Sequence, residues 1–151
     1  MALVPAVLAL GPRRWPFLAR VVVAGAVVEP AVRLLPLPLA ARLAGARLVL
    51  DDAVATRDAW PELTDAERER CELALRVLAR RPFRATCLRR SLVLASLLRR
   101  RRPDLRVGVS KRAGVVAAHA WLEIDGASLD PEAVQYRGLT PLVPATPGAG
   151  A

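Results

Sequence analysis

The stretch VVAAHAWLEIDGASLD, residues 115–130, decides the fold predicted for this chain. Its first eleven residues are typical of an extended strand, Gly126 marks a turn, and residues 127–130 form a short further strand or its end. Upstream, the run LRVGVSK at residues 105–111 alternates in part between apolar and polar side chains, as a strand does. Gly114 falls between the two runs. The second half of the chain is therefore expected to form a small antiparallel sheet.

A helix is predicted over TDAERERCELALRVLARR, residues 64–81. Thr64 is a plausible N-cap, and Glu67 follows three residues later, which is the pattern of a capping box. Pro82 is expected to end this helix, because the residue before a proline is disfavoured in helical conformation. Cys71 then lies inside the helix.

A second helix is predicted directly afterwards, over ATCLRRSLVLASLLRRRR at residues 85–102. Its apolar residues follow the spacing of a buried helical stripe: Leu88, Leu92, Ala95 and Leu98. Thr86 is a possible N-cap, which places Cys87 in the first turn. Four arginines, residues 99–102, are expected to close the helix, where cations suit the helix dipole, and Pro103 stops it.

Residues 1–50 are apolar and dotted with arginines and prolines, and short helices broken at the prolines are expected there. A polar break at Asp51 and Asp52 ends this part. Helices followed by an antiparallel sheet predict an α+β fold. The predicted organisation is an apolar helical extension at 1–50, a core at 51–142 and a loose Pro/Gly/Ala-rich tail at 143–151.

Length and composition limit the class of protein. A chain of 151 residues fits one domain, and its 54% hydrophobic content is not that of a disordered segment. The two cysteines are too few for a disulfide framework and lack zinc-ligand spacing, so a cytoplasmic protein without a bound metal is expected. The apolar run at 21–28 is too short to span a bilayer, which needs about 20 residues. Peripheral membrane contact stays compatible with the apolar N-terminal third.

The formal net charge is +9, and Lys111 is the only lysine among 23 cationic residues. Such a surface attracts acidic peptides, acidic proteins, nucleic acid or anionic lipid. The basic run at 99–103 is not interleaved with aromatic residues, and no nucleic-acid-binding motif is present, so nucleic acid is not an expected partner. That run either contacts phosphates or forms a solvated helix end.

Three side chains together suggest nucleophilic catalysis. Cys87 at a helix N-terminus experiences the dipole and free N–H groups that favour a thiolate. His119, the only histidine, lies within a predicted strand and can exchange a proton with the thiol. Asp130, expected on the following strand, can reach back to the other imidazole nitrogen and orient it. The same helix amides can stabilise an oxyanion.

Each of these residues also has an ordinary structural role. A lone cysteine is most often a small core residue, a histidine beside Trp121 is often structural, and an aspartate before Pro131 often starts a turn. Asp125 is a rival to Asp130, although it sits in the predicted turn. Arg89 and Arg90 support the thiolate, grip an acidic substrate, or lie on the surface. Ser91 is either a site neighbour or a packing residue.

The ordered blocks PFRATCLRRSLVLASLLRRR, VGVSK, AHAWLEIDG and SLD resemble the small leader peptidases of lasso-peptide biosynthesis, which belong to the transglutaminase-like superfamily of papain-type cysteine enzymes. The resemblance covers roughly residues 51–142. It implies a papain/transglutaminase-like core and a catalytic triad, which falls on Cys87, His119 and Asp130. It implies neither a metal nor an organic cofactor.

The resemblance also implies a role: removal of the leader from a ribosomally made precursor peptide, before a separate ATP-dependent lasso cyclase joins the freed N-terminus to a carboxylate. A separate small leader-recognition protein is implied as partner, because this chain shows no such domain ahead of its core and is expected to be the stand-alone protease half. Two alternatives remain: a transglutaminase-like acyl transferase, which shares the acyl-thioester, and a non-enzymatic basic binding module. The net charge would steer association with an acidic leader or recognition protein.

Overall fold

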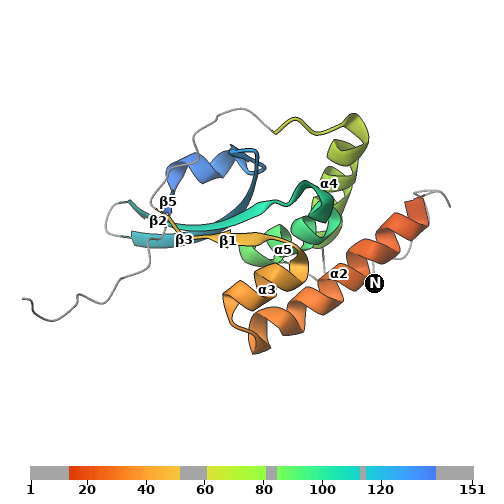
Figure 1. Ribbon diagram of the computed structural model, residues 1–151, viewed down its shortest axis with the longest axis horizontal. Coiled ribbons are helices and arrows are strands. Elements are labelled where there is room, and N and C mark those ends of the chain that lie inside the picture. Colours follow the sequence, from red (N-terminus) through yellow and green to blue (C-terminus); the bar gives the residue numbers. More distant parts are fainter. Residues whose placement is uncertain (1–13, 52–60, 81–84, 113–114, 139–151) are drawn as a thin grey trace, which may run out of the picture.

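A computed structural model of the chain describes residues 14–51, 61–80, 85–112 and 115–138. The expected tail at 143–151, Pro82 and Gly114 lie outside these ranges. Apart from one short strand between the second and third described helices, the α-helices precede the strands, so the predicted α+β class is confirmed (Figure 1). The elements in chain order are α2 (Trp15–Leu34), α3 (Leu37–Ala44), β1 (Arg47–Val49), α4 (Asp65–Leu78), α5 (Cys87–Leu97), η2 (Arg99–Arg101), β2 (Asp104–Arg112), β3 (Val115–Ile124), β4 (Ala127–Ser128), η3 (Pro131–Gln135) and β5 (Arg137–Gly138).

A purely antiparallel sheet was expected, but the observed sheet is mixed. Strands β1 to β4 lie in chain order, with β5 paired to β2. The long hairpin of β2 and β3 and the pair of β3 and β4 are antiparallel, but β1 runs parallel to β2. Parallel strands need a long crossover connection, usually helical, and α4 and α5 lie in this one. Strand β1 was missed because three residues are too few to show alternation.

Helix α2 contradicts the expectation that prolines break the N-terminal region into short helices. It runs for 20 residues with Pro30 inside it, and only near Pro36 does the chain leave the helix and start α3. A proline removes one helical hydrogen bond. The buried stripe of α2 extends on both sides of Pro30, and this packing holds the helix together: Leu18, Val21, Val28 and Ala31.

The two central helices begin where the sequence predicts. Thr64 caps α4, and its capping box with Glu67 is complete, so this prediction is confirmed. Helix α5 begins at Cys87 after the N-cap position Thr86. The arginines beyond it do not continue the helix, because α5 ends at Leu97 and Arg99–Arg101 form a separate 3₁₀ turn.

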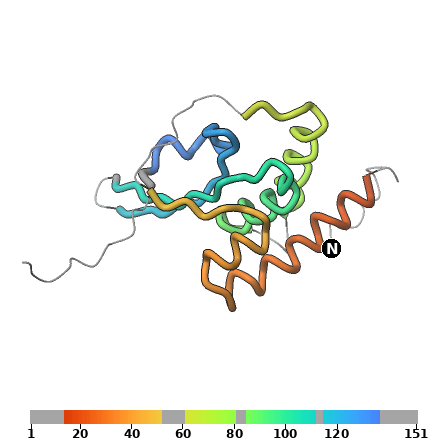
Figure 2. The backbone as a smooth tube through the Cα atoms, in the orientation of Figure 1, coloured from red at the N-terminus to blue at the C-terminus, as the bar shows by residue number. Residues whose placement is uncertain are grey.

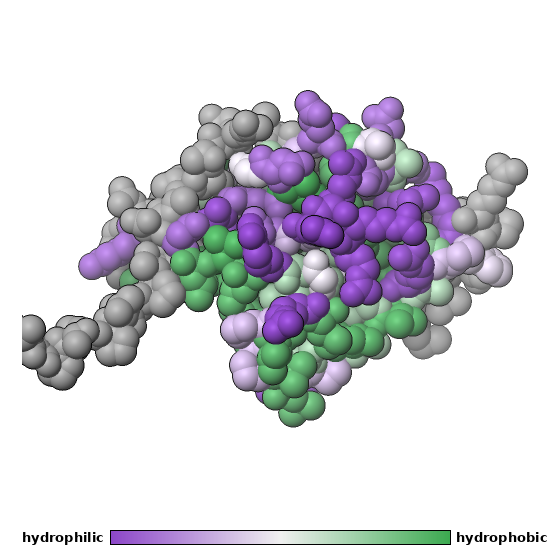
Figure 3. Space-filling model, viewed as in Figure 1, coloured by the Kyte–Doolittle hydropathy of each residue, from purple (hydrophilic) through white to green (hydrophobic). Residues whose placement is uncertain are grey.

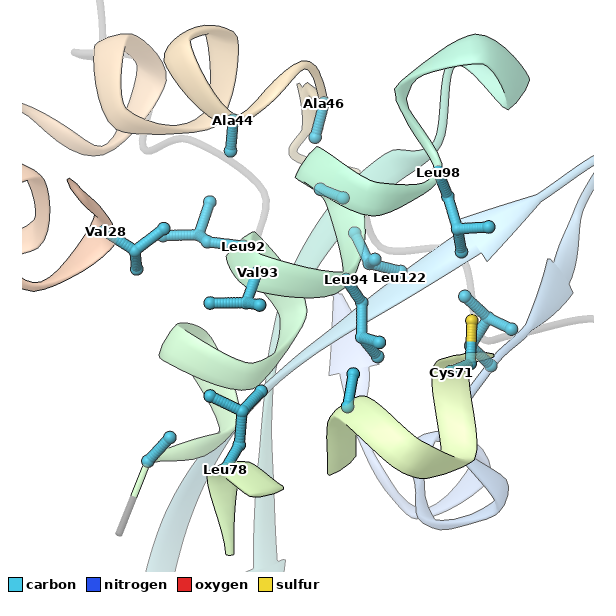
Figure 4. Close-up of a cluster of buried hydrophobic side chains, with 14 of the residues drawn as sticks. Val28, Ala44, Ala46, Cys71, Leu78, Leu92, Val93, Leu94, Leu98 and Leu122 are labelled. Atoms are coloured by element: carbon cyan, nitrogen blue, oxygen red, sulfur yellow. The ribbon is translucent and has the colours of Figure 1, made fainter. Parts of the chain in front are cut away.

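Helix α5 is the centre of the core. Leu92 and Val93 are almost fully buried, and one cluster joins side chains of α2, α3, α4 and α5 to Leu105 and Leu122 of the sheet (Figure 4). The described part of the predicted extension, residues 14–50, thus shares a core with the rest. Figure 2 shows α2, α3 and α5 on one face of the sheet and the segment containing η3 on the other.

The opposite face of the sheet carries a smaller cluster formed by Trp121, Ala133 and Tyr136. Successive residues of a strand point to opposite faces, so Ala120 and Leu122 enter the main core while Trp121 lies under η3. Within the described residues, no helix is long and apolar enough to cross a membrane.

Candidate active site

The thiol of Cys87 stands at the start of α5 and is partly buried. Thr86 makes no side-chain cap bond to this helix, unlike Thr64 at α4. The first N–H groups of any helix lack intrahelical partners, so those of α5 are available to an anion. Cys71 lies inside the core, where burial raises the pKa of its thiol to about 11. The two cysteines therefore differ in exposure: Cys71 is buried in the core, and Cys87 is only partly buried at a helix start.

His119 and Asp130 form a hydrogen-bonded pair. Nε2 of His119 lies 2.8 Å from Oδ2 of Asp130, with 12% of the imidazole side chain and 34% of the carboxylate side chain exposed. When Nε2 carries the proton and donates it to the carboxylate, Nδ1 presents its lone pair. The pairing thus sets the tautomer that a general base requires.

Asp130 was expected on a strand, but it does not lie on one. Strand β4 ends at Ser128, and Asp130 is the N-cap of η3, where its Oδ1 accepts the N–H of Glu132 at 2.9 Å. Pro131 starts this 3₁₀ turn because its ring presets φ. One carboxylate therefore both starts the turn and binds the histidine, since each oxygen has its own partner. Asp125, the rival candidate, lies in the exposed β3–β4 turn with φ of 52°.

One pocket of about 320 Å³ contains all three predicted residues. Its wall also includes Arg90, Ser91 and Glu132. Ser91 is buried, and its Oγ donates to the carbonyl of Ala120 at 3.0 Å. This bond joins the helix that carries Cys87 to the strand that carries His119, so Ser91 acts as a structural neighbour of the site.

An aromatic side chain that sequence reasoning missed covers His119. The rings of Tyr136 and His119 stack with centroids 4.8 Å apart and an interplanar angle of 26°. Trp121 completes a cluster of three rings, with its centroid 6.3 Å from that of His119 and 6.5 Å from that of Tyr136. Tyr136 follows η3, and nothing in the sequence signals that this turn returns over the strand. The stacking restricts rotation of the imidazole.

A buried polar network holds Trp121 in turn. The indole Nε1 donates to Glu123 Oε1 at 2.9 Å, and Arg106 binds the other oxygen of the same carboxylate at 2.5 Å. Arg106 also pairs with Asp51. Glu123 is only 4% exposed, and a buried carboxylate is tolerated when it is paired in this way. The network anchors the strand on the face that also carries His119, since residues 119, 121 and 123 of β3 point to the same side.

The two arginines after Cys87 have different positions. Arg89 forms an ion pair with Glu29 of α2, in which Nη2 donates to Oε1 at 3.1 Å, and so links two helices of the core. Arg90 is exposed and lines the pocket. Of the pair, only Arg90 is placed to meet a bound substrate.

Among the described residues, one group has the composition of a metal site: His119, Asp130 and Glu132, with ligand atoms within 4.8 Å of one another. Nε2 of His119 cannot bind a metal and donate to Asp130 at once. The hydrogen bond between them therefore fits an orienting pair better than a coordination shell.

The family model of the transglutaminase-like superfamily matches residues 31–144, a range that starts within α2 and includes the whole pocket. Neither the curated proteins nor the solved structures yield a match to this chain. The family match covers well over half of the sequence. The chain belongs to the transglutaminase-like superfamily, whose members are generally cysteine-type enzymes.

Proposed function

We propose that this protein is a cysteine peptidase that removes the leader from a ribosomally synthesised lasso-peptide precursor. One observation carries the proposal: a pocket that holds a thiol at an uncapped helix N-terminus together with a histidine bonded to a carboxylate. The ordered sequence blocks around Cys87 and His119 support the substrate class through their resemblance to lasso leader peptidases.

The chemistry follows from the roles of the three side chains. Nδ1 of His119 takes the proton of the Cys87 thiol, and the sulfur attacks the scissile carbonyl carbon. The tetrahedral intermediate collapses as the imidazolium gives its proton to the leaving amine, and a thioester remains on Cys87. Water, deprotonated by the same imidazole, then releases the acid and restores the thiol. Asp130 stays ionised throughout and holds the imidazole in place.

The oxyanion of the intermediate needs hydrogen-bond donors. The N–H of Cys87 and its neighbours in the first turn of α5 are such donors, and Thr86 does not occupy them. Preorganised backbone donors stabilise the developing charge because they need no rearrangement during the reaction. The helix start thus serves both the thiolate and the intermediate.

The proposed partners follow from the substrate. A small leader-recognition protein presents the precursor, and an ATP-dependent cyclase uses the freed N-terminus, all in the cytoplasm. Catalysis by this chain itself requires neither a metal nor an organic cofactor.

The test compares cleavage by wild type, Cys87→Ala, His119→Ala and Cys71→Ala. Precursor and recognition protein are supplied, and the leader fragment is measured by mass spectrometry. We expect the first two variants to fold and to lose cleavage. Cys71→Ala is the matched control for the loss of a thiol, because Cys71 is buried and outside the catalytic pocket, and it should retain kcat. Undiminished leader release by Cys87→Ala would refute the mechanism.

The same measurement separates hydrolysis from acyl transfer to an amine, since both reactions pass through the thioester. A peptidase yields a leader with a free carboxyl terminus. A transferase yields an adduct in which the acyl group is joined to an added amine. Adducts without free leader would replace the peptidase proposal by the transferase.

A further inference from the structure

A second cleft, larger than the catalytic pocket, lies between α2, α4 and the turn η2. Its volume is about 640 Å³. The cleft gathers arginines from three elements that are far apart in the sequence: Arg20, Arg70, Arg99, Arg100 and Arg101. Figure 3 shows hydrophilic side chains gathered over the region of α4 and η2, above the apolar surface of α2 and α3.

Most of these arginines are available to a ligand. Arg101 binds Glu67 with Nη2 2.7 Å from Oε2. The structure shows no ion pair between any described acidic residue and the other four, all of which are exposed: Arg20, Arg70, Arg99 and Arg100. Four guanidinium groups around one cleft can bind carboxylates together, because each is a planar fork of donors that matches a carboxylate.

Part of the lining of the cleft is apolar. Phe17 of α2 and Leu97 at the end of α5 line it beside the buried Leu98. The cleft therefore offers apolar contact between its charges, which suits a peptide that alternates acidic and apolar side chains. Nucleic acid fits less well, because Phe17 is the single aromatic side chain among the described residues that line the cleft, and single-stranded nucleic acid is usually bound by several stacking aromatic residues.

The cleft adjoins the catalytic pocket along two helices. On α4, Cys71 lines the cleft and Leu75, one turn later, lines the pocket. On α5, Leu97 lines the cleft while Cys87 lines the pocket. Ten residues of helix span about 15 Å, which an extended peptide covers with roughly five residues.

We propose that this basic cleft is a binding site for an acidic segment of the peptide substrate, at least about five residues from the bond that is cut. The inference rests on the proposed peptidase function for the identity of the occupant. Binding at the cleft tethers the substrate and raises its effective concentration at Cys87. The arginines should therefore lower KM and have little effect on kcat.

Binding is tested first, on the full chain carrying Cys87→Ala so that no cleavage interferes. The probe is a fluorescein-labelled peptide of alternating glutamate and leucine, measured by anisotropy. Its control is the same peptide with glutamine for glutamate. We expect the acidic probe to bind and the glutamine probe not to, with affinity falling as salt rises.

Variants locate the site. Because exposed ion pairs are individually modest, Arg70→Ala and Arg100→Ala should each weaken the acidic probe about threefold, and the double variant about tenfold. The matched control is the double variant Arg42→Ala and Arg68→Ala, which removes the same charge from exposed arginines outside the cleft. An equal loss of affinity in both double variants would overturn the proposed site, because the net charge alone would then explain the binding. Tighter binding of a labelled single-stranded oligonucleotide, lost in the same cleft variants, would overturn the peptide as ligand.

Cleavage is then measured with wild-type Cys87 on precursors whose acidic leader residues are kept or changed to amides. The cleft variants should raise KM for the acidic precursor and leave kcat nearly unchanged. If neither the cleft variants nor the amide substitutions in the leader change cleavage, the cleft is not a substrate-binding site, while the peptidase function stands. Cleft-dependent probe binding without any cleavage would refute the peptidase function and, with it, the assignment of the occupant as substrate.

Discussion

Ser91 of α5 donates a hydrogen bond to the carbonyl of Ala120 on β3, with the two oxygens 3.0 Å apart. Ser91 lies one turn after Cys87, and Ala120 follows His119 directly. This contact therefore couples the helix of the nucleophile to the strand of the base. Positioning within a fraction of an ångström decides rates in such sites, so the bond links stability to catalysis.

Ser91→Ala should lower the free energy of unfolding by about 1 kcal/mol, because a buried carbonyl loses its partner. It should also lower kcat, because α5 and β3 lose a fixed register. Urea denaturation and leader cleavage measure the two effects. Ser96→Ala is the control: Ser96 Oγ bonds Val93 within the same helix, at 2.7 Å, and lines no part of the pocket. Equal loss of kcat in both variants would argue against the positioning role.

Asp130→Asn should reduce kcat on the order of 10²–10⁴-fold while keeping the fold. Asparagine retains an oxygen for the N–H of Glu132 but loses the charge that faces His119. Asp130→Ala should also lower the free energy of unfolding, by up to about 1 kcal/mol, because the cap disappears. Kinetics and thermal unfolding separate these effects. Asp125→Asn, in the exposed turn, should keep full activity; a loss there equal to that of Asp130→Asn would reopen the choice between the two.

A thiol reagent should label Cys87 and spare Cys71 in the folded protein. Burial raises the pKa of Cys71 to about 11 and shields its sulfur, whereas Cys87 lines an open pocket. Iodoacetamide at about pH 8, followed by peptide mapping, gives the two rates. In urea both cysteines should react. Comparable labelling of Cys71 in the folded chain would show that α4 opens readily.

Stability should fall in acid through Glu67. The hydrogen bond from Arg101, and after it that from the Thr64 amide, lowers the pKa of Glu67 from 4.5 to about 2. A lowered folded-state pKa means that the stabilisation is present above pH 4.5 and is lost as the pH falls from about 4.5 toward 2. Urea unfolding should therefore show Glu67→Gln destabilised at pH 6 and closer to wild type at pH 2–3. Arg101→Gln should show the same pH dependence. A difference in unfolding free energy between wild type and variants that does not change with pH would exclude the Glu67–Arg101 pair as the cause of acid destabilisation.

Gly45→Ala should destabilise the protein more than Gly126→Ala. Both glycines have positive φ, 84° and 77°, which costs about 1–2 kcal/mol for an L side chain. At Gly45 an added Cβ also meets Cβ of Arg99 at 2.8 Å, whereas at Gly126 nothing lies within 4 Å. Thermal unfolding measures both. Equal losses would mean that the turn carrying Arg99 shifts freely.

Much of the fold was predictable because its signals are local. The capping box of Thr64 and Glu67, the start of α5 at Cys87 and the strand around His119 all depend on neighbours within one helical turn or one strand. The failures share a cause as well. Pro30 stays helical because distant packing outweighs one lost hydrogen bond, and the short strand β1 exists only through its pairing with β2, more than fifty residues later.

The sequence by itself determined the fold class, the capped helix α4 and the three side chains with the right chemistry, because caps, periodicity and residue type are written in adjacent positions. Tertiary structure alone decided what these side chains meet. It brought Cys87, His119 and Asp130 to one pocket and laid Tyr136 over the imidazole. It also gathered arginines from three elements around one cleft. Such contacts join residues up to about eighty positions apart, and only long-range burial selects them.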